Sequence, residues 1–164
     1  MGTTGLLTVR LRRQDDDEFI RNVAQEAFAR WSHAPKHSIM AMIHGRTART
    51  IVAEKDGELL GFAIVTFEAL NRPFGPWSHP VVGHLDAIAV RKDARRMGVG
   101  QVMLAGAETI ARECNAVCMT LHTARGNRPA LGLFATYGYQ PTIEIPEFYR
   151  NGHAAWAMTK LLAT

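Results

Sequence analysis

A basic, glycine-containing segment is the part of this sequence whose residue types could most directly hold a ligand. Residues 95–100 read R-R-M-G-V-G, and they stand between an apolar run and a helical pattern. Glycines allow dihedral angles that a Cβ forbids, so successive N–H groups can point at a ligand, while a helix N-terminus and arginines add positive charge. The segment lacks the ending of a Walker A loop and the dinucleotide fingerprint. It therefore predicts either a phosphate-binding loop of another kind or a tight strand-to-helix turn.

Two titratable residues precede this loop. His84 and Asp86 lie two apart within residues 81–90, V-V-G-H-L-D-A-I-A-V, whose second half is apolar on both faces as in a central strand. Residues two apart on a strand face the same side, and an imidazole with a pKa near 6.5 can accept a proton at neutral pH. The pair is therefore a candidate proton relay. A hydrogen-bonded core histidine beside an aspartate that binds a cationic substrate is the alternative.

The surrounding periodicities predict the elements that position these residues. In the first half we expect a strand, two helices and a hairpin over residues 7–11, 15–31, 35–44, 50–54 and 58–67. After a proline-containing loop at 71–80, the second half alternates strands and helices over residues 81–90, 98–112, 117–123, 127–137, 139–145 and 154–162. The Asp56-Gly57 dipeptide is typical of a hairpin, so the sheet begins antiparallel. The order indicates an α/β fold on one sheet of mixed direction.

Bulk composition limits the classes of protein. The chain has 164 residues, 47% of them hydrophobic, so we expect a single domain over residues 1–164. No apolar run approaches the roughly 18 to 20 residues of a membrane helix and no signal pattern opens the chain, which predicts a cytoplasmic protein with no membrane partner. The net charge of +4 suits a polyanionic small ligand, and no nucleic-acid-binding motif is present.

Cysteine usage gives no sign of redox or metal chemistry. Cys114 and Cys118 are the two cysteines, four residues apart near the end of a predicted helix, and no His pair with metal-ligand spacing accompanies them. We expect two reduced core thiols and no metal site.

Three motifs make the sequence resemble the GNAT N-acetyltransferase family. The pattern Q/R-x-x-G-x-G/A follows the strand H-L-D-A-I-A-V, and the family uses it for the pyrophosphate of acetyl-CoA. A second motif, an Asn that opens a helix closed by a Gly-aromatic pair, is matched by Asn127, Ala130, Leu133, Gly138 and Tyr139. The segment F-Y-x-N-G from Phe148 resembles the last hairpin of the family. The matched stretch covers about residues 84–139.

The resemblance implies the GNAT acyl-CoA-binding fold, with one mixed, mostly antiparallel sheet flanked by about four helices, and acetyl-CoA as cosubstrate. Strand main chain would pair with the pantetheine arm, the Ile88 amide would face the acetyl carbonyl, and loop N–H groups would bind the pyrophosphate. These contacts fall on Ile88, Ala89, Val90, Arg95, Arg96, Met97, Gly98, Val99, Gly100, Gln101, Asn127 and Phe134. Each of these contacts has a purely structural alternative. The strand residues would only pack in the core, the loop would be a solvated turn, and Asn127 would only cap its helix.

The resemblance also implies the catalytic groups. Family members often place the groups that take the amine proton, directly or through water, at the positions of His84 and Asp86. The tyrosine with which the family usually protonates the thiolate, seven residues after the Asn, is replaced here by Phe134, which has no proton to donate. Tyr137 follows three residues later on the same helix and is the candidate replacement, with water as the other source.

Two functions follow from these motifs. The first is an N-acetyltransferase in which an amine of a small molecule or peptide attacks acetyl-CoA directly in a ternary complex, since the cysteines lie outside the matched site and nothing favours a covalent intermediate. The second is a non-catalytic acyl-CoA-binding or regulatory domain, suggested by Phe134. The sequence does not indicate which amine is the acceptor. It also leaves the oligomeric state open, with a homodimer as one option.

Overall fold

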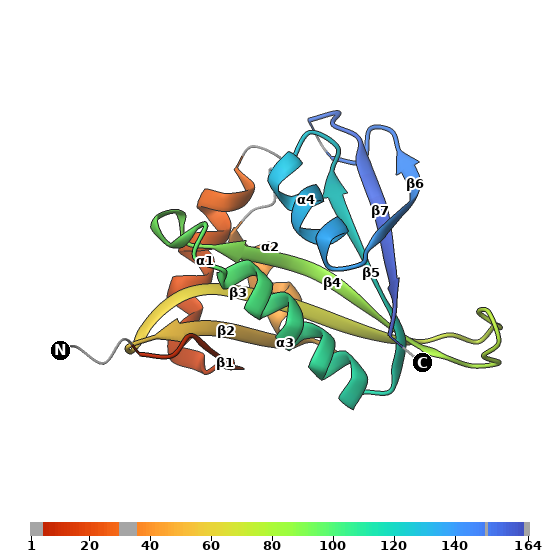
Figure 1. Cartoon of the computed structure of the whole chain (residues 1–164), viewed down its shortest axis with the longest axis horizontal. Helices are drawn as coiled ribbons and strands as arrows, with labels where there is room; N and C mark the ends of the chain where they lie inside the picture. Colours follow the sequence, from red (N-terminus) through yellow and green to blue (C-terminus); the bar gives the residue numbers. More distant parts are fainter. Residues whose placement is uncertain (1–4, 30–35, 150, 163–164) are drawn as a thin grey trace.

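Across the residues that the computed structural model describes, 5–29, 36–149 and 151–162, a seven-stranded sheet is covered by four α-helices (Figure 1). The strands are β1 (Thr8–Leu11), β2 (Arg49–Lys55), β3 (Glu58–Ala69), β4 (Val81–Val90), β5 (Ala116–Ala124), β6 (Gln140–Ile145) and β7 (Ala155–Leu161). The helices are α1 (Asp17–Phe28), α2 (Lys36–Ile43), α3 (Val99–Glu113) and α4 (Arg128–Thr136), with 3-10 turns at Gln14–Asp16 and Lys92–Ala94. The predicted order of elements and the α/β class are confirmed. None of the helices in the described ranges is both long and apolar enough to cross a lipid bilayer.

The sheet is mixed but mostly antiparallel, as expected. Its strand order is β1-β2-β3-β4-β5-β7-β6, and β4 with β5 is the parallel pair, while the other neighbours run antiparallel. The last strand of the chain, β7, lies between β5 and β6. The final hairpin therefore extends the sheet on the far side of β5.

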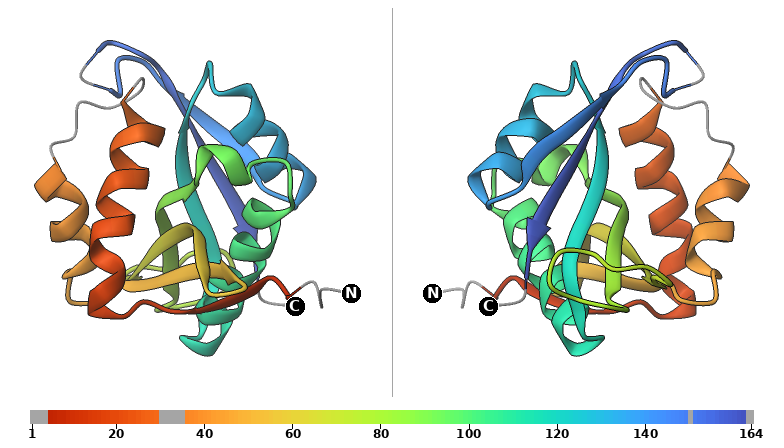
Figure 2. Two further views of the ribbon diagram at one scale, coloured as in Figure 1. Left: turned by 90° about the vertical axis from the view of Figure 1, so that its left-hand side faces the viewer. Right: turned by 90° about the vertical axis from the view of Figure 1, so that its right-hand side faces the viewer.

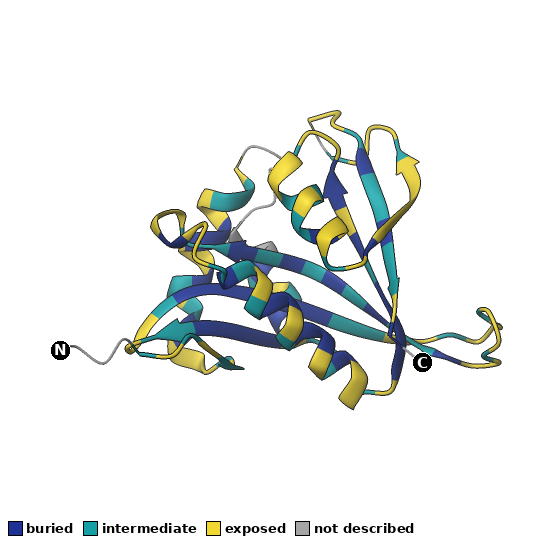
Figure 3. Ribbon diagram, viewed as in Figure 1, coloured by how far each residue is buried: buried dark blue, intermediate teal, exposed yellow. Residues whose placement is uncertain are grey.

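Helices pack on both faces of the sheet (Figure 2). On one face, α1 and α2 bury apolar side chains such as Ile20 and Val23 against Phe62 of β3. On the other face, Leu104 of α3 and Phe134 of α4 belong to the larger apolar cluster. The middle of the sheet is buried, and exposed residues lie on the outer sides of the helices (Figure 3). This two-sided burial explains why both faces of β4 are largely apolar in sequence.

The turn at Asp56 and Gly57 agrees with the sequence prediction, whereas the burial of Cys114 differs from it. Asp56 and Gly57 have φ of 53° and 79°, the positive values that a tight two-residue hairpin turn requires. Cys114 ends α3 and is half-buried rather than in the core, whereas Cys118 lies buried inside β5, within the strand predicted over residues 117–123. The chain turns between them at Asn115, with φ of 61°. The predicted end of the first helix near Trp31 lies outside the described residues.

Candidate active site

The separation of β4 from β5 halfway along their length is the main feature of the site. Their parallel ladder ends at the pair Leu85 and Leu121. Beyond this pair β4 continues beside β3 and β5 continues beside β7, and no ladder joins the two strands within the described residues. Figure 1 shows them diverging. The main chain of residues 86–90 therefore has an edge on the β5 side to which a ligand can add as a strand would.

A β-bulge lies where the ladder ends. Two residues of β3 stand opposite Leu85, Asp86 and Ala87 of β4, so Asp86 has no cross-strand partner of its own. As a result Leu85 and Ala87, two apart in sequence, enter apolar clusters on opposite faces of the sheet. His84 and Asp86 remain on one face because both meet Thr66, the first as its cross-strand partner and the second through a hydrogen bond.

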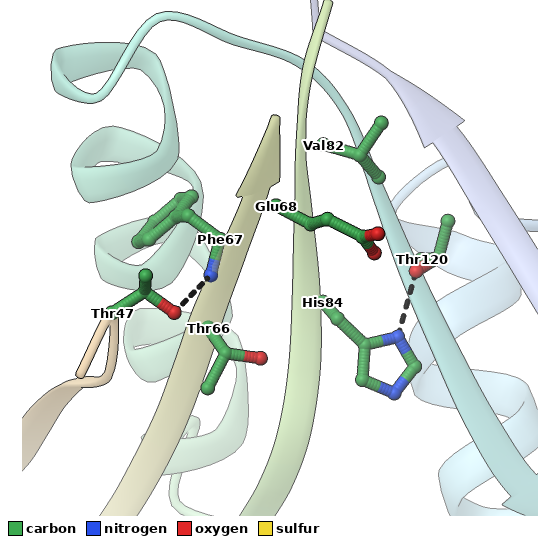
Figure 4. A pocket seen from close by; sticks show the side chains of 7 residues that line it. All are labelled: Thr47, Thr66, Phe67, Glu68, Val82, His84 and Thr120. Carbon is green, nitrogen blue, oxygen red and sulfur yellow. Dashed lines mark hydrogen bonds between the residues drawn. The ribbon is translucent and has the colours of Figure 1, made fainter. Parts of the chain in front are cut away.

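The side chain of His84 is oriented by the neighbouring strand. Its Nδ1 atom lies 2.7 Å from Oγ1 of Thr120, a contact that is dashed in Figure 4, and the same hydroxyl donates to the Gly83 carbonyl at 3.5 Å. The arrangement that satisfies both contacts has Nδ1–H donating to Thr120, which leaves the lone pair on Nε2. Burial lowers the pKa of His84, and the charge of Asp86 opposes this effect. The imidazole is therefore neutral at pH 7, and Nε2 can accept a proton.

Asp86 is positioned by β3. Its Oδ2 atom accepts a hydrogen bond of 2.7 Å from Oγ1 of Thr66, and the residue is half-buried. The carboxylate is thus fixed close enough to His84 to influence its pKa. The structure brings together the two residues that the sequence named as a relay.

The glycine-containing loop follows the C-terminal end of β4. Arg96 and Gly98 have positive φ of 66° and 80°, and Gly98 is the N-cap of α3. A non-glycine residue in this conformation is uncommon and is often found where a backbone holds a ligand. Among the residues that the structure describes, no side chain caps α3, so the N–H groups of its first turn are available. Arg95, Arg96 and Met97 are exposed around them, which gives the loop a basic rim.

The two glycines of the loop are required for different structural reasons. At Gly98 an added Cβ would meet nothing within 4 Å, so its φ alone favours glycine. At Gly100 an added Cβ would lie 3.2 Å from Cδ2 of Leu133, so this glycine allows α3 to approach α4. Val99 between them is buried, and Gln101 is exposed. The cofactor contacts of Gly100, Val99 and Gln101 remain predictions.

The residues named on α4 lie on the α3 side of the sheet. Asn127 is the N-cap, and its Oδ1 accepts a hydrogen bond of 3.3 Å from the main-chain N–H three residues later, while its Nδ2 has no partner in the described part of the chain. Phe134 is 3% exposed and packs edge-on against Tyr139, with ring centroids 5.8 Å apart. Tyr137 ends the helix, half-buried against the same cluster as Ile88. Their roles toward a thioester remain predictions.

His122 is a member of the site that the sequence pattern did not single out. Its ring centroid lies 5.1 Å from that of His84 and 4.7 Å from that of Phe148, which in turn meets Tyr149 edge-on at 4.9 Å. Partial burial and the charge of His84 lower the pKa of His122. A second imidazole that is neutral at pH 7 therefore faces the same region. The signal in the sequence was a titratable His within a predicted strand, two residues after Thr120 and hence on the same face.

Comparison with known proteins identifies the family. Residues 16–139 match the Acetyltransferase (GNAT) family. The N-alpha-acetyltransferase daf-31 of Caenorhabditis elegans is 29% identical over 115 residues, which cover 69% of this chain and 60% of the nematode protein. This chain therefore spans less than two thirds of that relative. An N-alpha-acetyltransferase of Sulfurisphaera tokodaii is 28% identical over 121 residues, 68% of each chain.

A solved structure gives the same fold. Ard1 from Thermoplasma volcanium superposes with a TM-score of 0.81 at 20% identity, covering 96% of this chain and 99% of that one. The fold and the family match agree on a GNAT acyltransferase domain. Because the match covers well over half of its length, the chain belongs to the GNAT acetyltransferase family.

Proposed function

We propose that this protein transfers the acetyl group of acetyl-CoA to an amine of a small molecule or peptide, by direct attack in a ternary complex. The observation that carries the proposal is the opening between β4 and β5 directly after His84, with a free strand edge that leads to the uncapped N-terminus of α3. Membership of the GNAT family supports it.

The groups along this path fit acetyl-CoA. The main chain of Ile88, Ala89 and Val90 offers N–H and C=O groups to the amides of a pantetheine arm. The N–H groups at the start of α3 and the exposed Arg95 and Arg96 complement a pyrophosphate. Acetyl-CoA supplies an activated acyl group as a thioester, whose carbonyl oxygen the Ile88 N–H would polarise.

His84 is the base of the proposed reaction. An amine is protonated in neutral solution and must lose a proton to attack, and the neutral Nε2 can take it directly or through water. Asp86 stabilises the imidazolium that results, because its charge favours the protonated form. His122, 5.1 Å away between ring centroids, can take over the proton. Tyr137 or water supplies the proton that the departing sulfur needs.

One observation favours a second candidate, a domain that binds acyl-CoA without turnover. Phe134 stands where the family usually has a tyrosine, and its ring is buried against Tyr139 with no polar group to donate. The oriented imidazole of His84 and the free edge of β4 that leads to α3 nevertheless support catalysis as the first candidate.

A thiol-release measurement separates the two candidates. Acetyl-CoA is mixed with the protein and, in turn, with polyamines, aminoglycosides, amino acids and peptides with free N-termini, and acetylated product is identified by mass. We expect acceptor-dependent release that a folded His84→Gln variant lowers by roughly 100-fold. Thermal stabilisation by acetyl-CoA without release from any acceptor would favour the binding domain.

A further inference from the structure

A hollow of about 340 Å³ lies beside His84, on the face of the sheet that α1 and α2 cover further along. Figure 4 shows its lining, which comes from β3, β4, β5 and the residues before β2. The lining includes Thr47, Thr66, Glu68, Val82, His84 and Thr120. Most of these side chains are polar, so the hollow suits a hydrophilic ligand more than an apolar one.

The register of the strands fixes how the lining is arranged. Thr66 and Thr120 are the cross-strand neighbours of His84 on its two sides, and Glu68 is the neighbour of Val82. Glu68 is therefore a diagonal neighbour of His84 on the same face, one strand across and two residues toward the start of β4, a relationship in which residues lie roughly 7–8 Å apart. Asp86 lies on the other side of His84, toward the opening between β4 and β5.

Glu68 is the acidic residue of this lining, and it is exposed to solvent. Thr66 donates to Asp86, Thr120 meets His84, and the Thr47 hydroxyl accepts from the Phe67 N–H at 3.2 Å. No hydrogen bond or ion pair engages the Glu68 carboxylate within the part of the chain that the structure describes. In Figure 4 it points over β4 toward Thr120 and His84. A carboxylate directed into a polar hollow attracts a cation there.

We infer that Glu68 determines acceptor specificity by binding a second positive charge, an ammonium or guanidinium group, on the acceptor whose reacting amine lies at His84. This inference rests on the proposed N-acetyltransferase function. A short acceptor whose reacting amine lies at His84 can place a second positive charge at Glu68, and both a short diamine and a peptide with a basic N-terminal residue carry such a charge. The acceptor class is therefore a short diamine or a peptide that begins with a basic residue.

Two matched pairs of acceptors test the inference and distinguish the two sources of the charge. One pair is diaminopentane and aminopentanol, with the rate for the diamine expressed per amine because it has two equivalent amines. The other is a peptide with N-terminal arginine and the same peptide with citrulline, so that the second charge is what distinguishes the members of each pair. We expect the native protein to show a kcat/KM at least about tenfold higher for the charged member of one pair, the scale of one charge-assisted contact. Glu68→Gln should reduce that ratio to within about twofold.

Glu113→Gln is the matched control, because Glu113 is an exposed carboxylate at the end of α3, the helix that covers the opposite face of the sheet from the hollow. It should keep the native preference. Equal kcat/KM within both pairs for the native protein, or an unchanged preference in Glu68→Gln, would overturn the inference while leaving acetyl transfer intact. Failure of all four acceptors to release thiol, in protein that acetyl-CoA stabilises thermally, would instead count against the proposed function and the inference together.

Discussion

The imidazole of His84 on β4 is oriented by the hydroxyl of Thr120 on β5, with 2.7 Å between Nδ1 and Oγ1. The two residues are cross-strand partners one position before the last pair of the parallel ladder, after which the strands separate. The paired part of the sheet thus orients the imidazole that we propose as the base, and the strands are separated beyond it, where we propose that the cofactor binds. A base that is oriented by paired strands is held more tightly than one on a loop.

Removing the Thr120 hydroxyl should affect turnover more than binding. Thr120→Val keeps the shape of the side chain but leaves Nδ1 of His84 without its partner, so the tautomer with a free Nε2 is no longer favoured. We expect kcat to fall about tenfold, part of what a general base contributes, with little change in acetyl-CoA affinity. Thr120→Ser should restore most of the rate. Equal rates for Thr120→Val and the native protein would show that this hydrogen bond does not position the base.

The charge of Asp86 should influence the pH below which kcat/KM declines. Burial holds the pKa of His84 below its usual 6.5, and the Asp86 carboxylate counteracts this shift. The base works only when neutral, so kcat/KM should decline as the pH falls through the pKa of His84, below 6.5. Asp86→Asn removes the charge that raises this pKa, and the decline should move to still lower pH, with kcat at pH 7 reduced.

Comparing the two pH profiles with the same acceptor isolates this effect, because the titration of the acceptor amine is common to both. The stability of the folded protein also depends on pH in this range. The unfolded chain binds a proton at His84 more readily than the folded chain, so stability decreases as the pH falls below 6.5, and the melting temperature should be recorded at each pH. A decline that moves to higher pH in Asp86→Asn would contradict the assigned roles.

Gly98 should be needed for cofactor binding through its backbone conformation. Its φ of 80° places the first N–H groups of α3, and a β-branched side chain disfavours this conformation by about 1–2 kcal/mol. Gly98→Val should abolish the thermal stabilisation that acetyl-CoA gives, in protein that still folds. Gly57→Val is the matched control, since Gly57 has a φ of 79°, equally open surroundings and a position in the β2–β3 turn. If both variants keep the shift, the phosphate-loop assignment is wrong.

A buried ion pair should stabilise the fold without contributing to the reaction. Both carboxylate oxygens of Glu108 on α3 lie 2.9 Å from Nζ of Lys160 on β7, and the Glu108 side chain is 8% exposed. Lys160→Met leaves the carboxylate buried without this partner and should lower the free energy of unfolding by about 2 kcal/mol. The double variant with Glu108→Leu should recover most of this loss. Lys92→Met, at an exposed lysine, should change chemical denaturation little.

The order of elements was predictable because it depends on local periodicity and turn chemistry. The Asp56-Gly57 turn and the apolar faces of α1 and α3 are properties of short segments, and the structure confirms them. Two other features could not be predicted in this way. The insertion of β7 between β5 and β6 and the end of the ladder at Leu85 are decided by pairing between distant strands.

The candidate site likewise combines features that local sequence patterns predict with features that depend on pairing between distant strands. The shared face of His84 and Asp86 follows from strand alternation, but the hydrogen bonds of His84 with Thr120 and of Asp86 with Thr66 depend on register and on the bulge. His122 joins the site only because β5 lies beside β4, and no spacing in the sequence connects it with His84. Patterns along the chain therefore name single residues, and contacts across the sheet assemble them.

Phe134 gives the prediction that bears most directly on the mechanism. Its ring is 3% exposed, so Phe134→Tyr places a hydroxyl in a buried site, where an unsatisfied polar group costs about 1–3 kcal/mol. If the ring points at the acetyl-thioester end of the opening, the sulfur of bound CoA gives that hydroxyl a partner. The melting temperature of Phe134→Tyr should then be lower than that of the native protein without ligand, and CoA should recover part of the difference.

The rates of the same variants decide which group protonates the departing sulfur. In a catalytic site Phe134→Tyr should keep or raise the rate of thiol release, because it adds a proton donor where the shape already fits an aromatic ring. Tyr137→Phe, measured alongside, should lower the rate about tenfold or more if the Tyr137 hydroxyl is the acid, and should leave it unchanged if water donates the proton. Adding Phe134→Tyr to Tyr137→Phe should restore the rate only if the two hydroxyls can reach the same sulfur. A Phe134→Tyr variant that is destabilised, is not rescued by CoA and releases thiol no faster would show that this ring belongs to the core alone.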